Sequence, residues 1–556
     1  MRRFCCFIVV LLTACDSGFQ AIDRRVEGLI ADANASVGSE NNFLTVFSPE
    51  TTSETSFKNP LPNTINPSFT ELSLVSRDQI EESGLHETLK QRANEFEESA
   101  TPLTLDQALE WAVQNAQEYR FAEYEYLSTT LSLLNELHLW GPRFFESIGV
   151  TADGDSTDGF YDTSLNVVHD FEITHRLPYG GSVSANALTT VAESLHSSTT
   201  NTTSKDSSLG VSLEMPLLRG YGTVARESII QSRRDMIYSA RTFERFRRSF
   251  FRSIVEDYLN LVVQRQSLAN AQRGVDSLQQ LANRQTALYE SGRTRLYDSA
   301  DAENQALASV ARLSQSWERY RLAVDRFKVR IGWPIDDSVR IEPTFLGLKP
   351  VETSMSTAVT RALTFRLDLQ NEYNKVDDAL RRVKNAKNDI APDLDFTASA
   401  TLPTEENSIG GFDGRDVDYA VGLTFSVPLD RESQRISSRK SQILYERAKR
   451  SLRTLRESVA IEVRSSLRNI EVYQFTLNLQ ERNVEIAKLG LSSINADPDR
   501  VSVLDQTRAI SELQNAQDAR DSARRDLELS ILDYLLQAGL LRIQQNGNMF
   551  RSGDLG

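Results

Sequence analysis

The chain offers few groups of residues that could carry out chemistry. Its five histidines have neither cysteine partners nor the spacing of metal ligands: His86, His138, His169, His175 and His196. His169 and His175 lie in a stretch that alternates like a strand, so we interpret them as surface residues and not as a metal site. No glycine-rich loop that could cradle phosphate occurs. We therefore expect no enzymatic activity, no metal and no cofactor.

One acidic segment, residues 153–158 (DGDSTD), faintly resembles a calcium-binding loop. The glycine of that motif and its terminal glutamate do not fall at the required positions. We interpret the segment as an exposed acidic turn.

The first residues have the pattern of a signal peptide. Arg2 and Arg3 precede an apolar run over residues 4–14. This run is too short to span a bilayer, but it has the length of a signal-peptide core. We expect residues 1–14 to be removed.

The residues at the expected cleavage site, 12–15 (LTAC), resemble a lipobox. In a lipobox the cysteine, here Cys15, is lipidated and becomes the mature N-terminus. Its lipid chains would anchor the protein without a transmembrane helix. The other two cysteines, Cys5 and Cys6, leave with the signal peptide, so neither a disulfide nor a thiolate metal site remains.

Charge and hydropathy narrow the class of protein. The net charge is −15, and removal of two arginines with the signal peptide lowers it to −17, which argues against nucleic-acid binding. After Ala14 no run of about 18 apolar residues occurs. Any membrane crossing would therefore use a closed β-barrel, the other structure that satisfies its backbone in lipid.

Arginines are concentrated in one proline-free stretch. Arg234, Arg241 and Arg248 are seven residues apart and so share one stripe of a helix. We interpret the run as a solvated helix face paired with acids on other helices, and not as a nucleic-acid surface. Its members are Arg226, Arg233, Arg234, Arg241, Arg245, Arg247, Arg248 and Arg252.

The elements that position these residues occur twice in the chain. Residues 210–217 (GVSLEMPL) and 422–429 (GLTFSVPL) are both short alternating strands that end at a proline. Each precedes a very long stretch without proline, which indicates a long helix packed as in a coiled coil. Little regular structure is expected in residues 15–100, a polar N-terminal extension that could tether the lipid anchor.

Each copy has the same order of helix, strands and helical hairpin. The first repeat covers residues 101–345, with a helix from Thr104 to Trp140, strands in 146–216 and a helical hairpin in 224–331. The second covers residues 346–543 and has the corresponding parts at 355–389, 392–428 and 429–537. Residues 544–556 form a tail.

The strands of one chain are too few to close a barrel. About four strands, and at most six, are expected, whereas small membrane barrels need about eight or more. Open sheet edges are not tolerated in lipid. The long helices also carry apolar stripes that need partners. The chain is therefore expected to oligomerise and to share one barrel.

This doubled plan resembles that of the TolC-like outer-membrane efflux proteins, including their lipoprotein branch. The resemblance covers about Thr101 to Ile543. It is based on the repeated unit and on three short segments: residues 216–222 (PLLRGYG), the turn at 292–298 and residues 332–334 (GWP).

The resemblance implies a mixed α/β membrane protein that assembles as a homotrimer. Three chains would share one 12-stranded barrel in the outer membrane, continued by a periplasmic α-helical coiled-coil barrel. The helix tips would meet a periplasmic adaptor protein coupled to an inner-membrane pump or ATPase. Two features depart from the family: the segment 150–208 is longer than a simple hairpin, and Asp16 follows the lipobox cysteine, where an acidic residue retains lipoproteins at the inner membrane in some bacteria.

The resemblance also directs attention to the helix tips. In the family, two aspartates three residues apart narrow the periplasmic mouth and favour cations; here Ser502 and Asp505 occupy these positions. Asp298 and Asp301, at the other tip, have the same spacing and so share a helix face. Rings of such carboxylates would favour cations in a narrow pore. Alternatively, these aspartates cap helices, whose N-termini favour negative charge.

The turns themselves are candidates for adaptor contact. They are Gly292, Arg293 and Thr294 at one tip, and Pro498 and Asp499 at the other. The sequence thus favours a passive exit duct of a tripartite efflux pump. A duct for type I protein secretion is one alternative, and a lipid-tethered, non-conducting periplasmic scaffold is another; the alternating strands argue against the scaffold.

Overall fold

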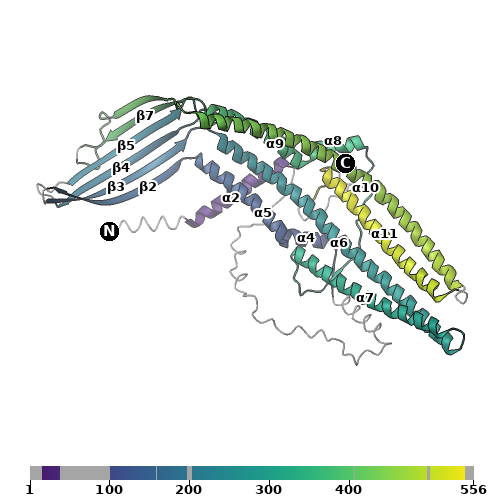
Figure 1. Cartoon of the computed structure of the whole chain (residues 1–556). Helices are drawn as coiled ribbons and strands as arrows, with labels where there is room; N and C mark the ends of the chain where they lie inside the picture. Colours follow the sequence, from purple (N-terminus) through teal and green to yellow (C-terminus); the bar gives the residue numbers. More distant parts are fainter. Residues whose placement is uncertain are drawn as a thin grey trace. The chain divides into compact units, whose positions relative to one another are not determined.

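A computed structural model describes residues 15–37, 100–157, 160–196, 203–405, 407–496 and 501–544. These residues are mostly helix, with one large sheet (Figure 1). The chain divides into two compact units, and each unit draws on both sequence repeats. One contains residues 126–240 and 371–454, and with them the large sheet; the other contains residues 241–370 and 455–544 together with 100–125.

The large sheet has six antiparallel strands in the order β2-β3-β4-β5-β7-β8 (Figure 1). The bounds are Arg143–Thr157 for β2, Phe160–Arg176 for β3, Ser182–His196 for β4, Thr203–Pro216 for β5, Asp393–Pro403 for β7 and Asp418–Ser426 for β8. The first four come from the first repeat and the last two from the second. The repeats meet where β5 pairs with β7, for example at Val211 opposite Ala400.

This sheet has more strands than the expected number of about four per chain. The first repeat contributes two hairpins instead of one, so the sheet has six strands. The long segment 150–208 is the reason, because it supplies the end of β2, all of β3 and β4, and the start of β5. A tight turn at Leu177–Gly181 joins the hairpins: the Leu177 amide donates to the Gly181 carbonyl at 3.0 Å.

Each face of the sheet has one character across all six strands, because alternate residues point to opposite sides. On one face the paired residues are mostly apolar, such as Val150 opposite Val167, and Ala398 opposite Val421. On the other they are mostly polar, such as Ser184 opposite Ser212, whose hydroxyls lie 2.7 Å apart. The register therefore turns a weak alternation in each strand into one coherent apolar face.

The helices have the order expected from the sequence. They are α4 (Leu105–Asn115), α5 (Gln117–Leu139), α6 (Glu227–Glu290), α7 (Leu296–Ile331), α8 (Met355–Phe365), α9 (Leu367–Asn388), α10 (Glu432–Ala496) and α11 (Val503–Gln537). In the described residues, no helix has a stretch long and apolar enough to cross a membrane.

Each repeat opens with two helices where the sequence suggested one. The break falls at Ala116 in the first repeat and at Arg366 in the second, both with extended backbone. The Arg120 guanidinium then donates to the freed carbonyl of Gln114 at 2.6 Å. Neither break contains a proline or a glycine, and the apolar spacing continues across both. The sequence therefore indicated one uninterrupted helix in each repeat.

A further helix, α2 (Cys15–Val37), lies where little regular structure was expected. It buries Val26, Ile30 and Ala33, whose spacing of four and three residues places them on one face. This short apolar stripe is embedded in a polar segment, which is why composition alone misses it. Residues 38–99 and the tail from 545 lie outside the described residues.

Candidate gating and docking residues

The turn between α6 and α7 is an exposed tip. Gly292 has a φ of +69°, and a Cβ added there would meet nothing within 4 Å. The Gly292 amide donates to Tyr289 O and the Arg293 amide to Leu288 O, both at 2.8 Å, so the end of α6 is closed by its own backbone. The Arg293 side chain is exposed. This is the geometry of a rigid, solvent-facing turn, which suits a docking surface.

The first carboxylates of α7 follow this turn directly. Asp298 is in the first turn of the helix, and the Thr294 hydroxyl lies 3.4 Å from its Oδ2. Asp301 is one turn further along and is half-buried, as Asp298 is. Thr294 is therefore engaged with the helix start, which reduces its availability as an adaptor contact.

The start of α11 has a reciprocal cap. Ser502 is the N-cap residue, and its Oγ accepts a hydrogen bond from the Asp505 amide at 3.1 Å. The same hydroxyl donates to Asp505 Oδ2 at 2.7 Å. Asp505 thus stabilises the helix start, as the capping interpretation predicts. Both residues remain exposed, so capping does not remove the charge from solvent.

A small apolar cluster brings the two helix starts together. Val503, the first residue of α11, is buried with Leu278 of α6 and Ala302 of α7. Asp505 is therefore held close to the helix pair that carries Asp298 and Asp301. Spacing predicted Asp298 and Asp301, and the family resemblance predicted Asp505, but only the structure places them on adjoining helix ends.

Three of the residues singled out from the sequence have side chains that the structure does not describe. Pro498 and Asp499 lie outside the described residues. Cys15 is the first residue of α2, and its side chain is not among those described. Within the described residues, no group of three or more potential metal ligands occurs. His169 instead lies 3.2 Å from Glu146 on the apolar face of the sheet.

Part of the arginine run pairs with acids on other helices, as predicted: Arg234, Arg245 and Arg252. Two further members pair within α6 and are not solvated. Arg247 and Arg248 of α6 are only 4% and 3% exposed. Both contact Glu244, at 2.8 and 2.9 Å. Arg248 also donates to Gly539 O at 3.3 Å. These guanidiniums therefore hold the segment after α11 against α6, which a solvated face could not do.

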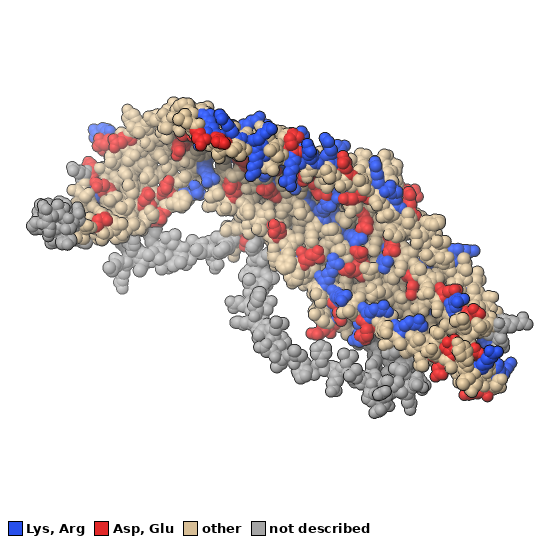
Figure 2. All heavy atoms as spheres, viewed as in Figure 1, with Lys and Arg blue, Asp and Glu red and all other residues tan. Residues whose placement is uncertain are grey.

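Another arginine of the run lies in the unit that holds the sheet. Arg234 pairs with Asp378 of α9, which also accepts hydrogen bonds from Tyr238 at 2.6 Å and Arg381 at 3.0 Å. Burial by itself would raise the pKa of Asp378. The hydrogen bond from Tyr238 and the charges of Arg234 and Arg381 outweigh burial, so the pKa lies below its usual value. On the face shown in Figure 2, basic and acidic side chains are intermixed over the helices.

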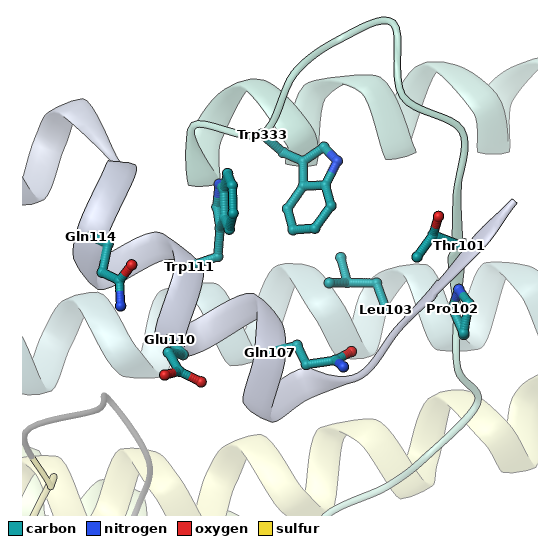
Figure 3. Close-up of a pocket in the computed structure, with 8 residues that line it drawn as sticks. All are labelled: Thr101, Pro102, Leu103, Gln107, Glu110, Trp111, Gln114 and Trp333. Atoms are coloured by element: carbon teal, nitrogen blue, oxygen red, sulfur yellow. The ribbon is translucent and has the colours of Figure 1, made fainter.

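A cavity of about 340 Å³ lies beside Trp333, in the segment that follows α7 (Figure 3). Figure 3 shows the indoles of Trp111 and Trp333 next to each other; their centroids are 4.5 Å apart. Trp111 Nε1 donates to Gly332 O at 3.2 Å. Gly332 has a φ of +74°, and a Cβ there would lie 2.4 Å from Asn115 O. Residues 332–334 (GWP) therefore form a packing junction. Close packing against Asn115 requires the glycine, and the contact with Trp111 uses the tryptophan.

The family model described as outer membrane efflux protein matches residues 358–528. No curated protein sequence matches the chain. The fold is similar to solved outer-membrane proteins, two of them described as channels, at sequence identities that show the fold alone. These are OprN (15% identity, TM-score 0.60, covering 78% of this chain and 89% of that one), CmeC of Campylobacter jejuni (14%, 0.60, 78% and 85%) and VceC of Vibrio cholerae (14%, 0.60, 78% and 96%).

These findings confirm the resemblance to the outer-membrane efflux proteins that the doubled plan suggested. They also confirm the mixed architecture of a sheet and long helical hairpins. Two of the similar structures, OprN and CmeC, are described as outer-membrane channels.

Proposed function

We propose that this chain, which carries an outer membrane efflux protein domain on the fold of outer-membrane channels, is the exit duct of a tripartite efflux pump. It would conduct substrates passively across the outer membrane, with its helices in the periplasm and with no catalytic step of its own. The observation that carries the proposal is the sheet with one apolar and one polar face. In membrane barrels the apolar face contacts lipid and the polar face lines the lumen.

Unsatisfied surfaces support a homotrimer. Within the part of the chain that the structure describes, strands β2 and β8 each pair on one side only, and open edges do not persist in lipid. Helix α10 also carries apolar side chains that are about half to two-thirds exposed in the single chain: Ile436, Ile443, Ile461, Val472, Phe475, Leu479 and Ile486. Copies of the chain would cover both surfaces at once, pairing strand edges and packing helices.

The anchor and the partners complete the proposal. Lipid on Cys15 would tether the N-terminus to the outer membrane, and α2 begins at that residue. The two exposed tips, which hold Gly292 and Arg293 on one side and the start of α11 on the other, would contact a periplasmic adaptor joined to an inner-membrane pump. The closed backbone of the first tip supports this assignment, because a rigid turn loses little entropy on docking.

Mass measurement of a Cys15→Ser variant extracted from membranes is the first test. A trimer that needs detergent and forms ion-conducting pores in planar bilayers is expected. A soluble monomer or dimer without pores would contradict the duct and favour a scaffold. Reduced efflux in cells carrying an Arg293→Glu variant, with the trimer intact, would then support adaptor contact at this tip; unchanged efflux would contradict it.

A further inference from the structure

The four strands of the first repeat all have the alternation of a membrane barrel. On the apolar face, β2 contributes Ile148 and Val150, which pair with residues of β3, and β4 contributes Val183 and Ala185, which pair with residues of β5. The second repeat continues the same face with Tyr419, Val421, Leu423 and Phe425 of β8, which are 62–82% exposed.

The connection from β3 to β4, which ties the additional hairpin β2–β3 to the rest of the sheet, is packed tightly. Gly180 and Gly181 of its turn have φ values of +107° and +84°, and a Cβ at Gly181 would lie 1.9 Å from Glu214 O. Tyr179 of the turn stacks on Tyr221, with centroids 6.2 Å apart, and its carbonyl accepts from the Gly222 amide at 2.8 Å. This turn is thus packed against the segment that leads into α6, so β3 and β4 are built into the wall.

Strand length and direction also suit a barrel wall. The six strands are 9 to 17 residues long, and about 9–11 residues cross a bilayer when tilted. Strand β2 leaves the end of the sheet where the helices join, and β8 returns to it. The β8 strand of one copy would therefore be antiparallel to the β2 strand of the next, so the pattern continues across the boundary between copies.

We propose that all six strands belong to one shared barrel. Three chains then form an eighteen-stranded barrel, whereas four strands per chain would give a twelve-stranded one. This inference rests on the proposed trimeric duct. Because barrel diameter grows roughly linearly with strand number, the barrel is about 1.5 times as wide as a twelve-stranded one. Barrels of 16–18 strands leave an aqueous channel. The exit therefore passes bulkier hydrated solutes than a twelve-stranded barrel would.

Disulfide trapping of the closing edges tests this directly. Ser147 of β2 is combined, as cysteine, with a cysteine at Ala420, Gly422 or Thr424 of β8, a small scan that allows for the unknown stagger between copies. All four positions lie on the polar face. Within one chain the two edges are separated by five strand spacings, roughly 24 Å, so a disulfide forms only between copies.

The matched control moves the first cysteine to Ser184 of β4, on the same face. In a twelve-stranded barrel built from β4, β5, β7 and β8, this residue would lie on the closing edge. Single-cysteine variants report any background from Cys15. The readout is the ladder of covalent species after oxidation in membranes, with pore formation by the same samples measured in bilayers.

The expected result is a ladder that ends at the trimer for at least one Ser147 combination and at the monomer for every Ser184 combination. Linking through Ser184 alone, a ladder that ends at the dimer, or a conducting trimer without links would each overturn the eighteen-stranded barrel while the duct stands. Absence of both oligomer and pores would overturn the duct itself, and the barrel with it.

Discussion

At the scale of single residues, Asp505 is the carboxylate whose two roles can be separated. If its charge narrows the mouth of the duct, Asp505→Ala will raise single-channel conductance or weaken block by divalent cations, because a repeated carboxylate attracts cations into a narrow pore. Recordings in planar bilayers with and without Mg²⁺ measure both quantities. Unchanged values for both would exclude Asp505 from the gate.

The cap supplies the matched control for this experiment. Ser502→Ala removes the hydroxyl that accepts from the Asp505 amide but keeps the carboxylate. It should cost about 1 kcal/mol of stability, the usual effect of losing an N-cap. Divalent block should be retained in Ser502→Ala. Equal loss of block in both variants would show that helix geometry, and not charge, sets the mouth.

The pKa of Asp378 predicts how acid affects the contact between α9 and Arg234 of α6, and with it the stability of the protein. This pKa is held below the usual value of about 3.9 in the folded protein. A carboxylate with a depressed pKa contributes stability that is fully present above the unfolded-state value and is lost as pH falls through the folded-state value. The thermal midpoint of the native protein should therefore fall as pH drops below about 4.

Asp378→Asn should remove that part of the pH dependence. At neutral pH it should also lower stability by roughly 2 kcal/mol, because hydrogen bonds to a charged group are lost. Thermal melts followed by circular dichroism between pH 2 and pH 7 measure both effects. Asp413→Asn, in an exposed loop where Asp413 pairs only with its neighbour Arg415 among the described contacts, is the control and should leave the neutral midpoint unchanged. An acid response in Asp378→Asn equal to that of the native protein would contradict the assignment.

At the scale of elements, the end of α7 depends on the absence of a side chain at Gly332. Gly332→Ala places a Cβ against Asn115 O and separates the two tryptophans, so folding of this junction should fail or its melting midpoint should drop sharply. Gly347→Ala is the control: its φ is +66°, but nothing lies within 4 Å. It should cost only the left-handed strain, about 1–2 kcal/mol. Equal effects of the two substitutions would show that contact with Asn115 is unimportant.

The elements that sequence predicts well are those with strong periodicity. The long helices α6 and α10 could be predicted from apolar spacing and the absence of proline, within a few residues of their observed ends. The breaks at Ala116 and Arg366 could not, because side-chain and packing contacts favour them without any local turn residue. Sequence also underestimated the strands. Residues 153–157 were interpreted as part of an exposed acidic turn, but they form the end of β2, where pairing with β3 overrides the local turn signal.

The candidate site was predictable to the level of residue type and tip. Aspartate spacing identified Asp298 and Asp301, and the family resemblance identified Asp505, but their proximity depends on the burial of Val503 against α6 and α7. The arginine run was recognised from the sequence, but its burial was not. Burial depends on the segment after α11, whose backbone carbonyls accept hydrogen bonds from Arg247 and Arg248.

At the scale of the whole molecule, the polar face of the sheet determines what the barrel favours. It carries more carboxylates than guanidiniums: Asp153, Asp170, Glu172, Asp206, Glu214, Asp393, Asp395 and Asp418 against Arg143 and Arg176. If this face lines the lumen, each carboxylate is repeated in every copy. Closely spaced like charges create a field that concentrates counter-ions. The duct should therefore prefer cations over anions.

Reversal potentials across a KCl gradient measure this preference. Selectivity for K⁺ should be clear at 0.1 M and weaken at 1 M, because the screening length falls from about 10 Å to about 3 Å. Replacing Glu172 and Glu214 by Gln should shift the reversal potential towards zero. Glu146→Gln is the matched control, since Glu146 lies on the apolar face beside His169, and it should leave selectivity unchanged. A preference for anions, or an effect of Glu146→Gln equal to that of the double variant, would contradict the assignment of this face to the lumen.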